Sequence, residues 1–262
     1  MLPVMILDPI QQAARDQFQR QSANYGKSHI LANTEDVASA LSGIEVPPGA
    51  TALDVATGGG HTAIYLAGRG FSVTAADISQ AMLDNASKLA AESGFSIATR
   101  LHEAEKLPYS SGSFDLVSCR VAAHHFSDRD AFVCEVARVL KSGAHFLLID
   151  GSVPDGEPDA EEWIHQVEKL RDPSHGRFLS PGAWTALCER HGLQVLRCET
   201  APFKQPDLDW YFQTAGTTAE NRVKVRELVH NAPDPARRVF RIAQEDGKTV
   251  WWWPRLSLVA LR

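Results

Sequence analysis

The chain has 262 residues, of which 44% are hydrophobic and 22% are charged, and its formal net charge is −6. This composition is typical of a globular protein with one large domain, or one domain and an appendage, that buries a sizeable core. The negative net charge, without a local run of lysines and arginines, argues against a nucleic-acid partner.

The N-terminal stretch and the cysteines both predict a cytoplasmic protein. The first ten residues, MLPVMILDPI, are apolar, but Pro3, Asp8 and Pro9 interrupt them and no basic segment precedes them, so they match neither a signal peptide nor a membrane span. No cysteine has a CxxC partner or metal-ligand spacing. The cysteines are Cys119, Cys134, Cys188 and Cys198. We therefore expect reduced core thiols, no metal site and no membrane span.

The middle of the chain alternates predicted strands with predicted helices. Hydrophobic patterning predicts strands at residues 51–56, 71–77, 95–102, 113–122 and 144–150. Helices are expected at 61–67, at 80–93 with Ser79 as N-cap and Gly94 as the stop, and at roughly 129–141. Repeated strand and helix units of this length form a parallel sheet covered on both faces, so we expect a doubly wound α/β domain.

The first predicted strand runs into three glycines and then into a helix that begins near His61. Glycines allow a tight turn and a close approach of the backbone to a ligand, and the helix N-terminus directs free N–H groups at that ligand. Asp77 ends the second strand, where a carboxylate can accept hydrogen bonds from both hydroxyls of a ribose. The spacing of Gly58, Gly60 and Ala63 also fits the dinucleotide pattern GxGxxA, so these residues alone do not separate NAD from S-adenosylmethionine.

Asp54 favours S-adenosylmethionine. It lies within the first strand, four residues before Gly58, where dinucleotide folds usually have apolar residues. An anion here suits a site for the ammonium group of a methionine moiety. A nicotinamide-dependent oxidoreductase would also need a hydride-transfer site, and the sequence offers no candidate for one.

Three motifs resemble those of the class I S-adenosylmethionine-dependent methyltransferases, and specifically the UbiE-like ubiquinone and menaquinone methyltransferases, over roughly residues 18–151. LDVATGGG at 53–60 is similar to LDVGxGxG, AADIS at 75–79 to the ribose-binding acid, and EAEKLPYSSGSFDLV at 103–117 to DAexLPFxdxsFDlV. CRVAAHHFSD and LRDPSH resemble a bacterial subgroup of these proteins. The resemblance implies S-adenosylmethionine as cofactor and a seven-stranded doubly wound sheet whose last strand is antiparallel.

The resemblance also implies a set of cofactor-binding residues. The loop after the first strand would wrap the methionine end, with Asp54 organising it, and Asp77 would bind the ribose. Glu103 replaces the family's usual aspartate and Ala56 its commoner glycine. The full set is Tyr25, Asp54, Ala56, Thr57, Gly58, Gly60, Asp77, Ile78, Met82, Glu103, Ala104, Glu105, Arg120 and Ala122.

Residues 1–48 are expected to form a helical cover over the cofactor. This segment resembles the family's N-terminal region, with Phe18, Tyr25 and His29 at its spaced aromatic and histidine positions. The alternative is an ordinary amphipathic helix packed on the edge of the sheet.

Two histidines after the fourth predicted strand are candidate catalytic groups. Methyl transfer is an in-line displacement that needs a base only when the acceptor must lose a proton. His124 and His125 lie in the loop expected to face the methyl group, although histidines at strand ends often only hydrogen-bond the backbone. Arg171 and His175 are candidates to bind an acidic group of the acceptor, or to anchor a loop.

The C-terminal third is expected to determine the acceptor. We predict a core at 49–202 that ends with a strand at 193–201, an insert at 203–248 and a final antiparallel strand at 249–262, so the insert begins and ends at the mouth of the site. Because Pro254 cannot donate a ladder hydrogen bond, the tryptophans at 251–253 are expected to extend beyond the regular sheet. Trp210, Trp251 and Trp253 would form an aromatic pocket, or else fill the core beneath the insert.

The sequence thus predicts a cytoplasmic enzyme that methylates a carbon or oxygen of a small, flat, aromatic or quinol-like molecule. The alternative is a protein that binds S-adenosylmethionine without catalysis, as a sensor or an assembly partner. The acceptor, the oligomeric state and the pathway are not predicted.

Overall fold

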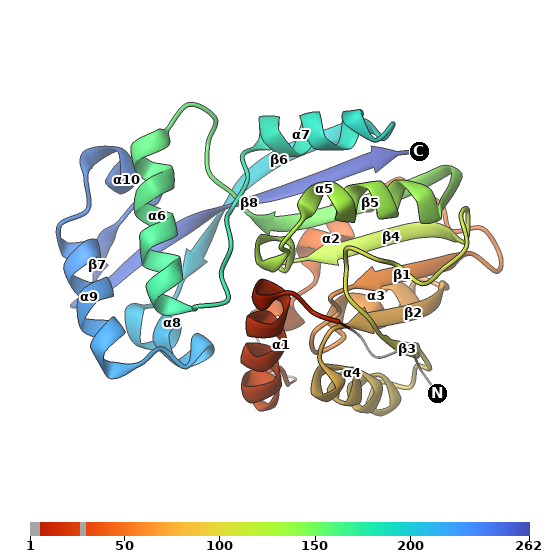
Figure 1. The fold of residues 1–262 in the computed structure, drawn as a ribbon, viewed down its shortest axis with the longest axis horizontal. Coiled ribbons are helices and arrows are strands. Elements are labelled where there is room, and N and C mark those ends of the chain that lie inside the picture. The colour runs from red at the N-terminus through yellow and green to blue at the C-terminus, as the bar shows by residue number, and fades with distance from the viewer. Residues whose placement is uncertain (1–5, 27–29) are drawn as a thin grey trace.

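The computed structural model describes residues 6–26 and 30–262, and it is organised around a twisted sheet with helices on both faces (Figure 1). Seven strands follow the order β3-β2-β1-β4-β5-β8-β6, and β7 pairs with β8 outside this path. The strands are β1 (Thr51–Val55), β2 (Ser72–Asp77), β3 (Ala98–Leu101), β4 (Phe114–Arg120), β5 (Leu140–Gly151), β6 (Gln194–Gln205), β7 (Ala243–Glu245) and β8 (Lys248–Leu261).

The pairing confirms the predicted doubly wound α/β class with an antiparallel last strand. Strands β1 to β5 pair in parallel, and β8 runs antiparallel to both of its neighbours, β5 and β6. The helices are α1 (Pro9–Gln21), α2 (Glu35–Ala40), α3 (His61–Gly68), α4 (Gln80–Glu92), α5 (Arg129–Val139), α6 (Pro158–Arg171), α7 (Pro181–Arg190), α8 (Leu208–Ala215), α9 (Ala219–His230) and α10 (Asp234–Val239).

Each face of the sheet carries its own apolar core. Leu256 and Leu258 of β8 belong to the core beneath α5 and α7, whereas Val259 belongs to the core beneath α2 and α3. This alternation follows from the two-residue period of a strand, whose successive side chains point to opposite faces. The sheet therefore holds its loops at the carboxyl ends of β1, β2 and β4 on a rigid base.

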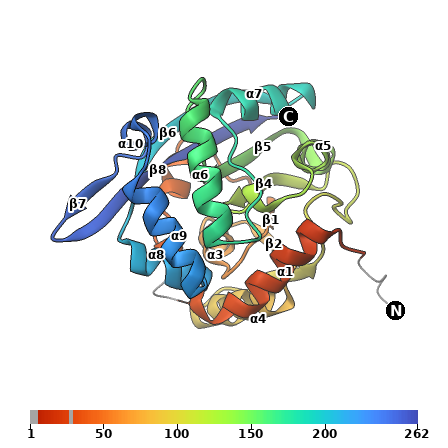
Figure 2. The same cartoon turned by 60° about the vertical axis from the view of Figure 1, so that its left-hand side comes forward.

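A third core lies at the N-terminal end of β8, where helices α6, α8, α9 and α10 pack together (Figures 1 and 2). Trp163 of α6, Tyr211 of α8 and Trp251 of β8 are buried in it. The predicted insert at 203–248 thus contributes three of these helices, and α6 joins them from the core part of the chain.

The tryptophans of β8 remain in the sheet, which corrects the prediction that they extend beyond it. Trp251, Trp252 and Trp253 pair in register with Gln205, Lys204 and Phe203 of β6. The Pro254 carbonyl accepts a 2.8 Å hydrogen bond from the Ser152 N–H, so the residue's missing donor faces the β5 side. The β6–β8 ladder consequently needs no N–H from this proline.

The N-terminal segment packs beside the carboxyl ends of the strands. The side chain of Asp8 caps α1 in a capping box with Gln11, and α1 contacts α4 and α8. Figure 2 shows α1 alongside α4. His29, one of the residues expected in this cover, lies outside the described residues.

Two further predictions can be compared with the structure. In the described parts of the chain, no helix has the length and apolar character needed to cross a bilayer. Cys119 and Cys188 are buried as expected, but Cys134 is exposed on α5, so the cysteines are not all core thiols. All four are free.

Candidate active site

A cavity, here called the first cavity, lies at the carboxyl ends of β1, β2 and β4. Its floor is the glycine-rich turn, and its cover comes from the N-terminal segment. Of the predicted cofactor-binding residues, it is lined by Tyr25, Ala56, Thr57, Gly58, Asp77, Ile78, Met82, Ala104, Glu105, Arg120 and Ala122.

Glycine is favoured at each of the three positions of the turn for a different structural reason. Gly58 has φ +53 and borders the cavity, as does Ala56 at φ 54, a conformation in which a non-glycine residue is strained. A Cβ at Gly59 would lie 2.5 Å from the Tyr25 carbonyl oxygen, and one at Gly60 would lie 2.7 Å from the Ala86 Cβ. The absence of a side chain at Gly59 therefore allows the N-terminal segment to pack closely on the turn, and its absence at Gly60 allows α4 to do so. Gly60 does not line the cavity.

Asp54 organises the turn from beneath. Its carboxylate accepts hydrogen bonds from the Thr57 hydroxyl at 2.6 Å and the Ser118 hydroxyl at 2.7 Å. Burial raises its pKa to about 6, against the lowering effect of these hydrogen bonds. A cation in the adjacent cavity would favour the ionised form.

Asp77 joins the turn to the end of β2. One carboxylate oxygen accepts from the Gly58 N–H at 2.9 Å, and the other accepts from the Ser79 N–H at 2.9 Å. Burial raises its pKa to about 6. The side chain is held rigidly and retains lone pairs for a ligand with two hydroxyls.

The acidic segment after β3 lies partly away from the cavity. Glu103 is half-buried and does not line it, whereas its neighbours His102, Ala104 and Glu105 do. The Glu105 carboxylate accepts from the Ser127 N–H at 2.9 Å and from the Gln11 side chain at 3.1 Å, so it also tethers α1. His102 was not predicted, because its position in the motif carries no specific signal.

An ion-pair network fastens the N-terminal segment to the sheet. Arg120 at the end of β4 donates to the carbonyls of Leu31 and Asn33 and pairs with Asp36 at 2.9 Å. Asp36 also pairs with Arg255 of β8 at 3.1 Å. The cover over the first cavity is thereby tied to two strands.

A second cavity lies between the N-terminal segment, β8 and the α8 region. Its walls include Phe203, Trp210 and Trp253, together with the polar side chains of Gln17, Gln21, Arg171, Asp172, Gln205 and Arg255. Five residues line both cavities, and we call them the neck: Phe18, Tyr25, Leu31, Val121 and His125. The two spaces therefore share a wall at the end of β4.

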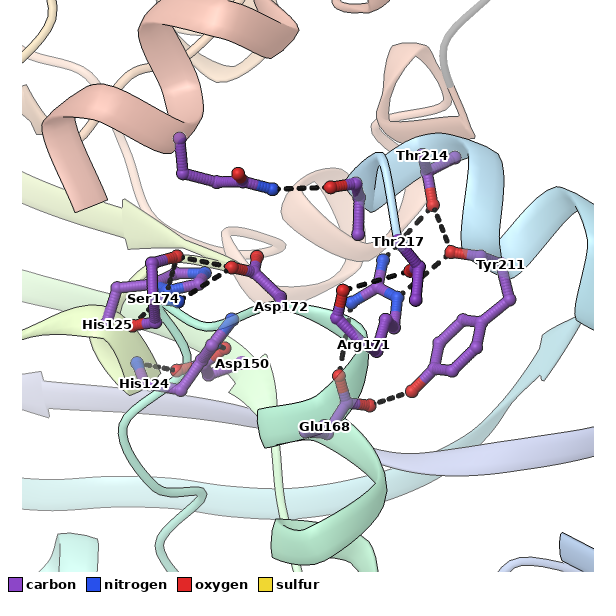
Figure 3. A network of polar contacts seen from close by, with 12 residues as sticks. His124, His125, Asp150, Glu168, Arg171, Asp172, Ser174, Tyr211, Thr214 and Thr217 are labelled. Carbon is purple, nitrogen blue, oxygen red and sulfur yellow. Dashed lines mark hydrogen bonds and ion pairs between the residues drawn. The ribbon is translucent and has the colours of Figure 1, made fainter. Parts of the chain in front are cut away.

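His125 lies in the neck with a fixed proton position. Its Nδ1 is 3.1 Å from the Ser174 carbonyl oxygen, which can only accept, so Nδ1 carries the proton and the neutral ring has its free lone pair on Nε2. Phe18 packs edge-on against the ring, with centroids 4.9 Å apart. Figure 3 shows His125, Ser174 and Asp172 side by side.

His124 lines the second cavity only. Its Nδ1 lies 2.6 Å from the Asp150 carboxylate, which also accepts from the His124 N–H at 2.9 Å. Burial holds the pKa of His124 well below its ordinary value, so the ring stays uncharged at neutral pH. Asp150 lies near the end of β5 and was not a predicted site residue.

Three residues predicted to bind the acceptor make structural contacts, and only one of them borders a cavity. Arg171 donates to Glu168 at 3.1 Å, to the Tyr211 carbonyl at 3.1 Å and to Thr214 at 3.1 Å, so it borders the second cavity with its donors engaged. His175 is buried beneath Phe178 and lines neither cavity. Trp251 is 1% exposed and packs on Tyr211 in the third core, whereas Trp253 and Trp210 do line the second cavity.

Comparisons with known proteins agree with this architecture. Residues 53–148 match the family described as "Methyltransferase domain". The chain is 32% identical to the uncharacterized methyltransferase YcgJ of Bacillus subtilis over 228 residues, which covers 86% of this chain and 88% of that protein. It is 39% identical to YafE of Escherichia coli, covering 67% of this chain and 84% of the relative.

The solved structure of the Bacillus subtilis YcgJ protein superposes with a TM-score of 0.80 at 29% identity, covering 88% of this chain and 99% of that one. The fold and its glycine-rich loop define a class I methyltransferase that uses S-adenosylmethionine. The chain belongs to the methyltransferase family that includes YcgJ.

Proposed function

We propose that the first cavity holds S-adenosylmethionine in the orientation that the motifs imply. The buried Asp77 would bind the ribose hydroxyls, Ile78 and Met82 would enclose the adenine, and the turn at Ala56–Gly58 would hold the methionine end. Ala104 and Glu105 border the same space, whereas Glu103 would have to turn inward to reach the adenine. The observation that carries this assignment is the convergence of these residues on one cavity.

We further propose that the methyl acceptor binds in the second cavity and that transfer occurs across the neck. The sulfonium would then lie beside Val121 and His125, with the acceptor atom on the other side. Such a position excludes water and holds the reacting atoms in line, which supplies most of the rate in methyl transfer. A protein that merely binds the cofactor would not need a second cavity that shares a wall with the first, so this arrangement favours catalysis.

The acceptor that fits best is a small molecule with a dissociable proton on oxygen or carbon, such as a quinol. The neutral form of His125 has its lone pair on Nε2, and Phe203, Trp210 and Trp253 offer aromatic walls for a flat ring. A similar protein, the 2-methyl-6-phytyl-1,4-hydroquinone methyltransferase of Synechocystis, is 30% identical over 64% of this chain and 54% of its own length. A UbiE C-methyltransferase of Bordetella parapertussis is 34% identical over 41% of this chain. Membership of the UbiE-like group is thus part of the proposal.

This assignment also gives each segment of the chain a proposed role. We assign residues 1–48 to a cover, 49–202 and 249–262 to the cofactor-binding core, and 203–248, with α6, to a cap over the acceptor. Cytoplasmic location stays a prediction from the sequence.

The experiment is a screen with S-adenosylmethionine labelled on its methyl group. The purified protein is incubated with each of a panel of benzoquinols, naphthoquinols and phenols, with the fully O-methylated ether of each as a matched control, and with a set of amines and thiols. Mass spectrometry should find the labelled methyl group on one class of free quinol or phenol, together with an equal amount of S-adenosylhomocysteine. Transfer only to amines or thiols would contradict the proposed acceptor class and leave the methyltransferase activity intact.

The same screen tests the role of the histidines. Replacing His125 with glutamine should lower kcat by roughly 10²- to 10⁴-fold, the usual contribution of a general base, with nearly unchanged cofactor affinity. His124→Gln should have the smaller effect, because His124 lines only the acceptor side. An unchanged kcat in both variants, with methyl transfer as the slow step, would leave catalysis to positioning alone.

A further inference from the structure

The loop after α6 carries two buried polar residues that the fold does not require for its core. Asp172 and Ser174 are 6% and 2% exposed, and both lie next to His125 (Figure 3). One carboxylate oxygen of Asp172, Oδ1, accepts from the Ser174 N–H at 2.9 Å and from the Ser174 hydroxyl at 2.6 Å. Buried carboxylates are costly unless they are paired, so this one needs an explanation.

The hydrogen-bond directions connect Asp172 to His125. The Ser174 hydroxyl has one proton and donates it to Asp172, so at 3.2 Å it can only accept from Nδ1 of His125. The Ser174 carbonyl accepts from the same Nδ1 at 3.1 Å. Both acceptors of the imidazole N–H thus belong to one residue, and Asp172 holds that residue in place.

We propose that Asp172, acting through Ser174, is a positioning residue that keeps the proton of His125 on Nδ1 and stabilises the imidazolium formed when Nε2 takes a proton from the methyl acceptor. This inference rests on the proposed function of His125 as a general base. It also restricts the acceptor to molecules that lose a proton during transfer. The arrangement of Asp172, Ser174 and His125 would have no role with an acceptor that has no proton to lose.

The acceptor O–H or acidic C–H gives its proton to Nε2 of His125, and the electron pair left on the acceptor atom forms the new bond to the methyl carbon. The bond between sulfur and methyl breaks, and its electron pair stays on sulfur as S-adenosylhomocysteine forms. The positive charge that leaves the sulfonium reappears on the imidazolium next to Asp172.

Several other groups surround His125 and must be considered together. The His124 ring lies 4.1 Å from it between centroids and the His175 ring 6.2 Å, and both have pKa values well below their ordinary range because they are buried. Asp150 is near on the β5 side, where burial raises its pKa to about 7, and Arg171 and Arg129 are the nearby cations. Burial acts to raise the pKa of Asp172, yet His125 and Ser174 keep it below its ordinary value. Asp172 is therefore the acidic group that remains ionised beside the ring.

The test is a histidine NMR titration of the full-length protein saturated with S-adenosylhomocysteine, which needs no acceptor. Long-range ¹⁵N–¹H spectra report the tautomer of each ring, and the His125→Gln variant assigns the His125 signals. In the wild type, neutral His125 should carry its proton on Nδ1. Asp172→Asn keeps Oδ1, and with it both hydrogen bonds from Ser174, while it removes the charge. Because an opposite charge nearby typically shifts a pKa by about 1–3 units, this variant should lower the pKa of His125 by at least about one unit.

Two further variants make the result specific. Ser174→Ala removes the hydroxyl but leaves the carbonyl acceptor, so it should give a smaller decrease in the same pKa. Asp84→Asn removes an equal charge from the exposed face of α4 and should leave the pKa unchanged. A wild-type proton on Nε2, or a His125 pKa that Asp172→Asn leaves in place, would overturn the inference. Failure of the quinol screen with the expected NMR result would instead refute the proposed acceptor.

Discussion

Replacing Asp54 with asparagine should stabilise the ligand-free protein at neutral pH. Burial raises the pKa of this carboxyl from 3.8 to about 6, so the folded state binds its proton more tightly than the unfolded chain does. The resulting stabilisation is complete at pH values below the unfolded pKa and is lost as the pH rises through the folded pKa. At neutral pH, two pKa units correspond to a cost on the order of 3 kcal/mol that asparagine does not incur.

The hydrogen bonds of Asp54 survive this substitution. Its side-chain partners are the hydroxyls of Thr57 and Ser118, and hydroxyls accept as readily as they donate. The asparagine N–H can therefore donate to one of them while its oxygen accepts from the other. The Ala63 N–H, which also donates to this carboxyl, can donate to the asparagine oxygen. We expect a net gain of about 1–3 kcal/mol in the free energy of unfolding at neutral pH.

Urea unfolding of the wild type and Asp54→Asn at about pH 7.5 and about pH 4.5 measures this gain. The difference should be largest at the higher pH and should fall to about a third at the lower one, where the folded carboxyl is protonated but the unfolded one is still mostly ionised. Asp84→Asn is the control for a change in net charge. A variant less stable than the wild type at the higher pH, or a difference that does not change with pH, would refute the reasoning.

The same substitution should change cofactor preference. S-adenosylmethionine carries one more positive charge, on its sulfonium, than S-adenosylhomocysteine does. Unit charges several ångströms apart interact by about 2 kcal/mol at an effective dielectric constant of 20. Calorimetry should therefore show that Asp54→Asn weakens binding of S-adenosylmethionine about thirtyfold more than binding of S-adenosylhomocysteine. Equal losses for both ligands would mean that Asp54 acts only through the shape of the turn.

Three more substitutions test separate parts of the account. Gly59→Ala places a methyl group against the Tyr25 carbonyl, so it should displace the N-terminal segment, speed its cleavage by protease and weaken cofactor binding without unfolding the sheet. Trp251→Ala should cost about 3–5 kcal/mol of stability, as expected for a buried tryptophan, measured by urea unfolding. Trp253→Ala should raise KM for the acceptor and leave the cofactor Kd unchanged, and the reverse pattern would move the acceptor out of the second cavity.

The centre of the sheet was predictable because β1 and β4 are almost wholly buried and clear helix signals separate the strands. The strand at 51–56 ends one residue earlier than predicted, where Ala56 turns to positive φ. Such a residue has no local signal, because alanine at this point gives no reason to expect a left-handed conformation. The third core was missed in part, because α6 reaches it from a distant part of the chain and only tertiary packing reveals that.

The cofactor site was more predictable than the acceptor site. Asp54, Asp77 and the glycine turn stand at fixed offsets within one unit of strand and helix, so their meeting follows from local geometry. Asp172 and Ser174, which contact or lie next to His125 in the structure, follow it by 47 and 49 positions in the sequence. His175, which carries a more conspicuous side chain in the same motif, lines neither cavity, and Arg171 borders the second cavity with its donors engaged. No pattern of residue types distinguishes these orientations.

A crystal structure of the complex with S-adenosylhomocysteine tests the central claim most directly. The account predicts that Asp77 accepts hydrogen bonds from the ribose hydroxyls and that the sulfur lies in the neck, beside His125 and open to the second cavity. A ligand whose sulfur points away from the neck, or whose ribose does not contact Asp77, would contradict the assignment of the two cavities.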